Sequence, residues 1–315
     1  MNKRILASEI GNLIWKILRF FILIGLSYVL IYPILYMVSM SFRTIEDVLD
    51  PSVIWIPKHF TLEHFEYSYA QMNYFSSMTT TLIMSIVGTA LQMISCSMVG
   101  YGLARFKFKT NGLWFVLVLL TLIVPAEAVT IPLYFQYKSF SIPIISPILE
   151  LAFGIKMPAF LTVNLIDSWF VFWLTAITAT GLRSGLYVYI FRQFFSNIPY
   201  EIEEAAVVDG AGFFKTFTTI MVPNASGSYL TVFLFSIVWY WNDTFYTSTF
   251  ISQKMTIAKA LSGLFGELSK NFANSPEYSP RLLAGSLLYI LPMLLMYMVL
   301  QRYFVQSIER TGIVG

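Results

Sequence analysis

The sequence predicts an all-α integral membrane protein that crosses the bilayer as six transmembrane helices. Of its 315 residues, 57% are hydrophobic and only 12% are charged, and the mean hydropathy is +0.69. Soluble domains of this length do not have such a composition. Stretches without charge supply the roughly 20 apolar residues that one helix needs to cross a bilayer core. An acidic segment between the fourth and fifth stretches predicts a cytoplasmic loop that contains a helix of its own.

Several classes of protein are excluded by what the sequence lacks. The net charge of +3 is small and dispersed, which argues against a nucleic-acid partner. Cys96 is the only cysteine, and His59 and His64 are the only histidines, so neither a disulfide framework nor a metal site is expected. No Gly-x-x-x-x-Gly-Lys-Ser/Thr phosphate loop occurs, so the chain itself should not hydrolyse ATP. We therefore expect no catalytic residues, no metal and no bound cofactor.

Positive charges and polar segments set the predicted topology. Basic residues before the first apolar run predict a cytoplasmic segment at 1–19, and the run itself is too long for a signal-peptide core. Arg105, Lys107 and Lys109 follow the second run at once, which places that loop inside as well. Both termini are then cytoplasmic, with a tail at 306–315. Within a transmembrane domain at 20–305, the predicted spans cover residues 20–42, 78–104, 113–137, 169–195, 224–250 and 282–301.

Residues 138–168 do not fit the six-span pattern. They are largely apolar but contain Pro143, Pro147 and Pro158. We interpret them as an external insertion, with a short interfacial helix, that helps to form a docking surface. The alternative is a seventh span, which would place the acidic loop on the opposite side of the membrane.

The loop at 197–223 has the local chemistry of a helix, a turn and a second helix. Pro199 suits a first helical position, Asn197 could cap it, and the acidic residues that follow favour the positive end of the helix dipole. Gly210 and Gly212 permit the positive φ of a helix stop and a sharp turn. The two predicted helices cover about 199–209 and about 213–222.

The same loop contains a spaced motif. From Glu204 it reads Glu-Ala-Ala, three residues, Gly, nine residues, Ile, one residue, Val-Pro. With this motif the chain resembles the permease subunits of ATP-binding-cassette (ABC) importers, specifically the carbohydrate-uptake branch that includes the maltose permeases, whose motif has leucine at the position of Val222. Residues 100–108 and 239–243 resemble two further stretches of that family. The matching loop positions are Glu204, Ala205, Ala206, Gly210, Ile220 and Pro223, and Asp209-Gly210-Ala211 match a fuller form of the motif.

The resemblance implies a multi-pass protein of the bacterial cytoplasmic membrane that imports sugars or oligosaccharides by alternating access. It implies three protein partners besides the lipid bilayer: a homologous second permease subunit, an ABC ATPase dimer and an extracytoplasmic solute-binding protein. ATP and magnesium would bind to the ATPase and not to this chain, which is then a transport subunit and not an enzyme.

The resemblance also implies how the loop would act, and "EAA loop" here means residues 197–223. Its first helix would dock in a groove of the ATPase and move as a rigid lever. Ala205 and Ala206 would allow close approach, and Glu203 or Glu204 would pair with a basic residue. Gly210 would set the elbow between the two helices. The remaining predicted coupling residues are Asp209, Ala211, Ile220 and Pro223.

Arg183 is the most informative single charge, because the predicted fourth span places it deep in the membrane. One hypothesis is that it lines the substrate cavity, with Tyr187 one helical turn further on, and that it binds an anionic sugar such as a uronate. The alternative is an ion pair with Glu127, with Asp243 or with the second permease subunit.

Glu127, Asn242 and Asp243 complete the candidate cavity residues. Carboxylates within spans rarely face lipid. Glu127 and Asp243 could therefore form hydrogen bonds between helices, or they could contact sugar hydroxyls or take part in gating. Asn242 belongs to the stretch at 239–243 that resembles the sugar permeases.

Two other functions compete with the importer. An ion-coupled secondary transporter would need coupling residues in the membrane and often has paired, interrupted helices. A membrane-embedded enzyme would need a catalytic cluster, and the spans contain no His-rich cluster, Asp pair or Ser/Lys dyad. Dependence of uptake on a proton gradient would favour the first alternative, and turnover without transport the second.

Overall fold

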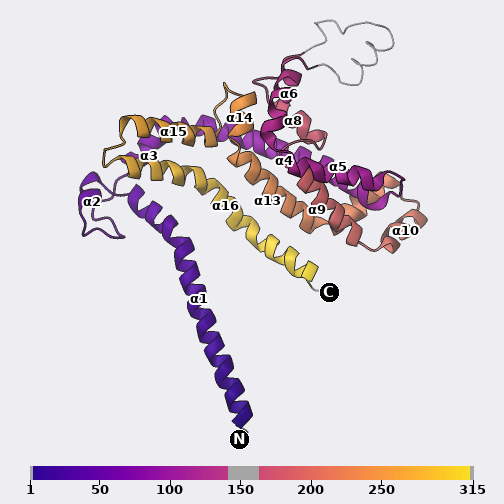
Figure 1. Ribbon diagram of the computed structural model, residues 1–315, viewed down its shortest axis with the longest axis horizontal. Helices are drawn as coiled ribbons and strands as arrows, with labels where there is room; N and C mark the ends of the chain where they lie inside the picture. The colour runs from indigo at the N-terminus through magenta and orange to yellow at the C-terminus, as the bar shows by residue number, and fades with distance from the viewer. Residues whose placement is uncertain (1–2, 141–162, 313–315) are drawn as a thin grey trace. The chain divides into compact units, whose positions relative to one another are not determined.

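A computed structural model describes residues 3–140 and 163–312, and within them the secondary structure is helical apart from isolated bridges (Figure 1). The side chains of residues 3–10, 126 and 304–312 are not described. The chain forms two compact units. Unit 1 contains residues 1–72 and 261–291, and unit 2 contains residues 73–260 and 292–315. Most of the predicted insertion at 138–168 lies outside the described residues.

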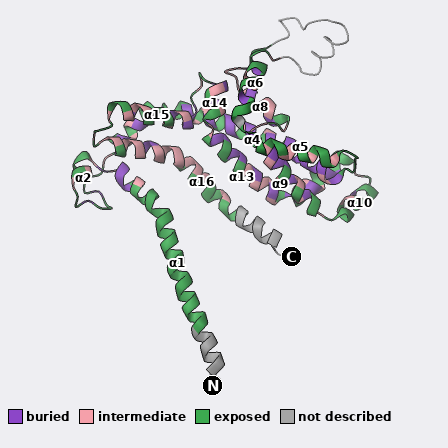
Figure 2. Cartoon of the chain, viewed as in Figure 1, coloured by how far each residue is buried: buried purple, intermediate pink, exposed green. Residues whose placement is uncertain are grey.

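Unit 1 begins with α1 (Lys3–Ser41), which contains the predicted first span. Gly11–Ser41 is 31 residues long, and the most apolar part of it has no buried residue (Figure 2). An apolar helix without a covered face is suited to lipid or to a neighbouring protein. Unit 1 also contains α2 (Ile45–Leu49), α3 (Glu63–Gln71) and parts of α15 (Ile257–Asn271) and α16 (Tyr278–Gly312).

A polar loop follows α1 and folds back on its end. The Arg43 guanidinium donates to Ser39 Oγ at 2.9 Å and to the Ile54 carbonyl at 2.6 Å. Asp50 accepts from Lys58 Nζ at 2.6 Å, and this contact together with bonds from Ser52 lowers the pKa of Asp50 to about 2. These bonds give an otherwise irregular segment a defined conformation.

Unit 2 is built around α4 (Tyr74–Arg105), which contains the predicted second span. It packs against α8 (Phe170–Ile177), α9 (Ser184–Asn197) and α13 (Ser226–Asn242) (Figure 1). Small residues of α4 allow this. A Cβ added to Gly100 would lie 2.7 Å from Phe191 Cβ and 2.9 Å from the Arg192 backbone nitrogen, both in α9. Close backbone approach at small residues is typical of helix packing in membranes.

Three helices of the described chain are long and apolar enough to cross a membrane: Gly11–Ser41, Tyr74–Arg105 and Tyr278–Tyr303. Two bent pairs of helices also meet the criterion, so the described part of the chain supplies three to five candidate spans. The bent pairs are Asn111–Ile123 with Glu127–Lys138, at 102°, and Phe213–Asn224 with Ser226–Asn242, at 78°.

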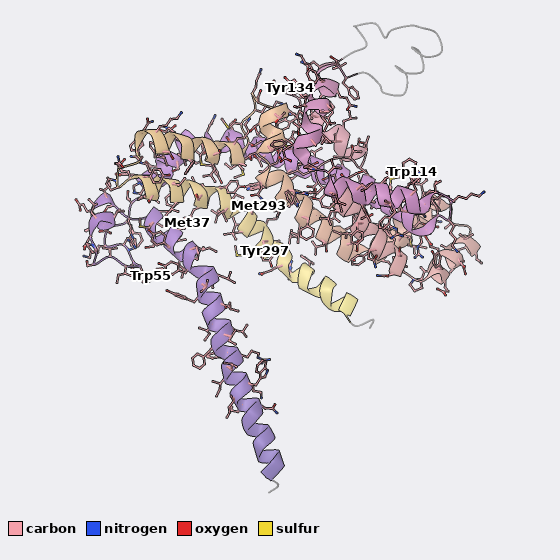
Figure 3. All side chains as sticks on the ribbon, viewed as in Figure 1. Met37, Trp55, Trp114, Tyr134, Met293 and Tyr297 are labelled. Carbon is pink, nitrogen blue, oxygen red and sulfur yellow. The ribbon has the colours of Figure 1, made fainter. Side chains whose placement is uncertain are left out.

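The third predicted span is two helices. α5 (Asn111–Ile123) ends with Val124 as its C-cap, and α6 (Ala126–Lys138) begins after Pro125. Val124 is extended, at φ −65° and ψ 121°, because a proline ring disfavours the α conformation of the residue before it. On α5, Trp114 is 56% exposed (Figure 3), which again leaves apolar surface for lipid or a partner.

The fourth predicted span is wrong as a continuous helix. α8 ends at Ile177 and α9 begins at Ser184, and the residues between them leave the helical conformation. Ala179 and Arg183 have φ of 55° and 57°, which is the left-handed region and is costly for residues other than glycine. The fifth predicted span, 224–250, is too long for one helix, because α13 ends at Asn242 and a separate α14 (Phe245–Phe250) follows.

Candidate functional site

The EAA loop forms a helical hairpin in unit 2. α10 (Tyr200–Val208) is followed by a turn and by α11 (Phe213–Thr216), which continues as one turn of π-helix at Phe217–Met221 and as α12 (Val222–Asn224). The π-turn ends two residues before Pro223, whose ring nitrogen has no proton to donate to the helix ladder. The predicted pair of helices is confirmed.

The caps of this hairpin differ from the prediction in two details. Pro199 is the N-cap and not the first helical residue, and Asn197 is the last residue of α9. Gly210 has the predicted positive φ, at 76°, whereas Gly212 has φ −75° and starts α11. Gly210 is therefore the one left-handed residue of this turn. Its conformation brings the Ala211 amide to the Ala206 carbonyl, to which it donates at 2.9 Å.

The predicted coupling residues separate into an outer and an inner set. Glu204 and Ala205 are exposed, and Val208 beyond them is 86% exposed. Ala206 is buried within the chain, at 4% exposure, so it packs the hairpin and does not form part of its outer surface. Asp209, Gly210, Ala211, Ile220 and Pro223 lie in the turn and in the return helix, and the Asp209 amide donates to the Ala205 carbonyl at 3.0 Å.

Glu203 points inward, to the last turn of α4. Its Oε2 lies 3.3 Å from Arg105 Nε, and its Oε1 accepts a 2.5 Å hydrogen bond from the Tyr101 hydroxyl. Of the two carboxylates that were expected to meet the ATPase, only Glu204 is free of these contacts. A groove of about 570 Å³ runs beside this pair, lined by Tyr101, Arg105, Phe106, Tyr200, Glu203, Glu204, Val207, Val208, Ala211, Phe213 and Thr216.

A second candidate site lies at the break between α8 and α9. The exposed Arg183 starts α9, and its guanidinium lies 4.2 Å from the centre of the Trp239 ring, as in a cation–π contact. Asp243, another of the predicted cavity residues, accepts the Tyr246 backbone amide of α14 at 3.3 Å.

The alternative of an intramolecular ion pair is not seen. Within residues 11–125, 127–140 and 163–303, no carboxylate oxygen lies within 4.0 Å of a nitrogen of Arg183. Glu127 is exposed in the first turn of α6. Asp243 accepts the Thr247 amide at 2.7 Å and thus caps α14. Asn242 donates to the Val238 carbonyl of its own helix at 2.8 Å.

Tyr187 differs from the other candidates because it is 0% exposed and packs in the main core of unit 2. A solute could reach it only if the surrounding helices separated. Arg183 and Tyr187 therefore do not share one open surface.

Sequence reasoning missed the polar network that holds the break. The Gln92 amide, in α4, donates to the Leu182 carbonyl at 2.7 Å and to Ser184 Oγ at 2.9 Å, and its carbonyl accepts from Ser236 of α13 at 2.8 Å. Ser95 donates to the Ala176 carbonyl at 2.5 Å. The Gln92 bond gives the Leu182 carbonyl a partner at the break, and the Ser95 bond adds a second partner to the Ala176 carbonyl, which already accepts the Ala179 amide at 3.2 Å. The signal was a stripe of polar residues in the second span: Thr81, Ser85, Thr89, Gln92 and Ser95.

Neither site resembles a metal centre, since the described residues contain no group of three or more His, Cys, Asp or Glu side chains that could hold an ion. What the two sites offer is an exposed acidic helix at one place and a cation beside an aromatic ring at the other.

The family of the chain follows from comparison with known proteins. The family described as "Binding-protein-dependent transport system inner membrane component" matches residues 97–310, which is more than half of the chain. The chain belongs to this family. The predicted resemblance is confirmed, and this inner membrane component is a multi-pass permease subunit of an ABC importer, a transport component and not an enzyme.

Relatives of this permease cover nearly its whole length. It is 25% identical over 295 residues to the arabinooligosaccharides transport system permease protein AraQ of Halalkalibacterium halodurans, covering 92% of this chain and 93% of the relative. It is 27% identical over 310 residues to the polygalacturonan/rhamnogalacturonan transport system permease protein YtcP of Bacillus subtilis, covering 94% and 96%.

A solved structure supports the fold. The permease superposes with a TM-score of 0.73 on a chain of a bacterial ABC transporter involved in the import of the acidic polysaccharide alginate, covering 93% of this chain and 98% of that one. At 19% sequence identity, this similarity concerns the fold alone.

Proposed function

We propose that this permease imports sugars or oligosaccharides, and that a separate ATPase drives it through α10. The bent pair of α5 and α6, the interrupted pair of α8 and α9, and α13 complete six spans, with both termini and the EAA loop in the cytoplasm. Its partners are a homologous permease, an ABC ATPase dimer that binds ATP and magnesium, and an extracytoplasmic solute-binding protein. The predicted segments at 1–19 and 306–315 are cytoplasmic, and the spans lie within 20–305.

The observation that supports coupling is the outer surface of α10. Glu204 and Ala205 are exposed side by side, on a helix that begins with acidic residues and ends at a glycine turn. A shallow surface at Ala205 allows close approach of another protein, and Glu204 supplies one charge for a basic residue. Gly210 fixes the angle at which the helix joins α11.

Replacing Ala205 by Trp tests this surface. The side chain is exposed, so Ala205→Trp should leave the permease folded and inserted. It should prevent close docking and lower ATP-driven uptake by about tenfold, the scale of an overpacked contact. Uptake into proteoliposomes, together with co-purification of the ATPase, measures this. Thr110→Trp, at another exposed position of unit 2, is the matched control. Normal assembly and uptake with Ala205→Trp would contradict the proposal.

The substrate we propose is an anionic, uronate-containing oligosaccharide. Arg183 is an exposed cation next to an indole ring and has no carboxylate of the described residues in ion-pair distance. Guanidinium groups form strong paired hydrogen bonds with carboxylates. The polygalacturonan/rhamnogalacturonan relative and the alginate transporter are in keeping with an acidic solute. Glu127, Asn242 and Asp243 would then meet hydroxyls of the sugar.

Arg183→Gln should therefore change substrate preference. We expect uptake of uronate oligosaccharides to fall at least about tenfold, the effect of one charge-assisted bond, while uptake of neutral oligosaccharides is unchanged. Competition assays in proteoliposomes give both values. Arg192→Gln removes another guanidinium that stacks on an aromatic ring, 3.8 Å from the centre of Phe115, and serves as the control. Equal losses for anionic and neutral sugars in Arg183→Gln would refute the assignment.

A further inference from the structure

The last turn of α4 holds the EAA hairpin through one carboxylate. Glu203 of α10 meets the Arg105 side chain at 3.3 Å and accepts the Tyr101 hydroxyl at 2.5 Å. The Arg105 side chain is 2% exposed and the Glu203 side chain 15%. Charges shielded from water in this way interact more strongly than a surface pair, and either one left alone is costly.

The same turn of α4 also holds the residue before Pro199, the first residue of α10 and the helix that follows α10. Arg105 Nη2 donates to the Ile198 carbonyl at 2.5 Å, and its guanidinium lies 4.3 Å from the centre of the Tyr200 ring. In the segment after α10, the Tyr101 ring packs against Phe213 of α11 and Phe217 of the π-turn, with centroid distances of 5.4 and 5.1 Å. The attachment therefore has three points along the hairpin.

α10 has little else to hold it. Of its nine residues only Ala206 is buried, so apolar packing fixes the helix weakly. The polar contacts of Glu203, together with the Tyr200 ring beside Arg105, thus connect α10 to the body of unit 2. Neighbouring Glu204 is exposed and has no such contact with α4. Two adjacent glutamates of the loop accordingly have different surroundings.

We propose that Glu203, Arg105 and Tyr101 form a clasp through which a displacement of α10 moves the cytoplasmic end of α4. The proposal rests on the coupling function described above. Because α4 also carries Gln92, thirteen residues or about 20 Å along the helix from Arg105, one rigid element joins the clasp to the break that presents Arg183. Glu203 is then a positioning residue for coupling, whereas Glu204 is a docking residue.

Glu203→Gln tests the clasp in the complete complex, reconstituted with its second permease, ATPase and binding protein. The substitution keeps the size of the side chain and removes the charge that pairs with Arg105. We expect the amount of solute imported per ATP hydrolysed to fall at least about fivefold, the lower range of coupling effects. The ATPase should still co-purify in normal amount. Glu201→Gln, an exposed carboxylate of the same helix, should leave the ratio unchanged.

Tyr101→Phe removes only the hydroxyl and gives a second, milder test. Since both variants act through one carboxylate, the effect of the double variant should be less than the product of the single effects. If Glu203 served folding alone, its replacement would lower solute uptake, ATP hydrolysis and co-purification of the ATPase together. The amount of solute imported per ATP hydrolysed would then stay unchanged. Ratios equal to wild type in both single variants would overturn the clasp. If the wild-type complex itself showed no ATP-driven uptake, the proposed function would fail, independently of the clasp.

Discussion

Gly100→Leu should abolish most of the folded permease. A side chain at this position would meet Phe191 Cβ at 2.7 Å and the Arg192 backbone nitrogen at 2.9 Å, so α4 and α9 would have to separate. Backbone atoms cannot yield as a flexible side chain can. Overpacking of this kind costs about 1–3 kcal/mol and more where backbones must shift, and the contact between α4 and α9 is the central one of unit 2.

The yield of monodisperse protein and its melting temperature in detergent measure this effect. Gly102→Leu is the matched control two residues away, because among the described residues, and outside the adjoining helix backbone, an added Cβ there would have one neighbour within 4 Å, Phe106 Cδ2 at 3.8 Å. Gly102→Leu should retain most of the wild-type yield. Equal yields for the two variants would mean that α4 and α9 do not approach each other as described.

Gln92→Leu should have the second largest effect. The substitution keeps approximate volume but removes the donors to Leu182 and Ser184 and the acceptor for Ser236. Each buried polar group left without a partner costs about 1–3 kcal/mol, so we expect a total loss of roughly 2 kcal/mol or more. The lost bonds are those that hold the break between α8 and α9, and the position of Arg183 depends on this break. We therefore expect solute uptake to decrease more than ATP hydrolysis.

A thermal melt in detergent, followed by uptake and ATPase assays, checks both parts of this expectation. Thr79→Ala is the control. Thr79 lies on the same helix but is exposed, and its hydroxyl donates to the Phe75 carbonyl of that helix. The Thr79→Ala protein should melt close to wild type. A Gln92→Leu protein as stable as wild type would show that the network does not support the break.

The parts of the fold that the sequence predicted are those with local chemical signals. Gly210 permits the turn after α10, because glycine can adopt the positive φ found there without a steric cost. The long apolar runs likewise identify α1, α4 and α16. None of these inferences needed knowledge of a distant residue.

The break between α8 and α9 had no comparable signal. Residues 178–183 carry two threonines and one glycine, which are weak helix formers, but no proline, so these residues alone do not place the break. The break is stabilised from a distance, because Gln92, ninety residues earlier, donates to the Leu182 carbonyl, and Ser95 donates to the Ala176 carbonyl at the end of α8. The inward direction of Glu203 was missed for the same reason, since Arg105 is distant in sequence.

The central proposal is that a separate ATPase drives this permease, and that a binding protein delivers the solute to it. The most direct test is the ATPase activity of the reconstituted complex, measured with binding protein that is empty or loaded with neutral or uronate oligosaccharides. We predict stimulation by the loaded binding protein alone, and stronger stimulation by uronates. Failure of an ATPase to co-assemble, with uptake that instead follows a proton or sodium gradient, would contradict the account and favour an ion-coupled transporter.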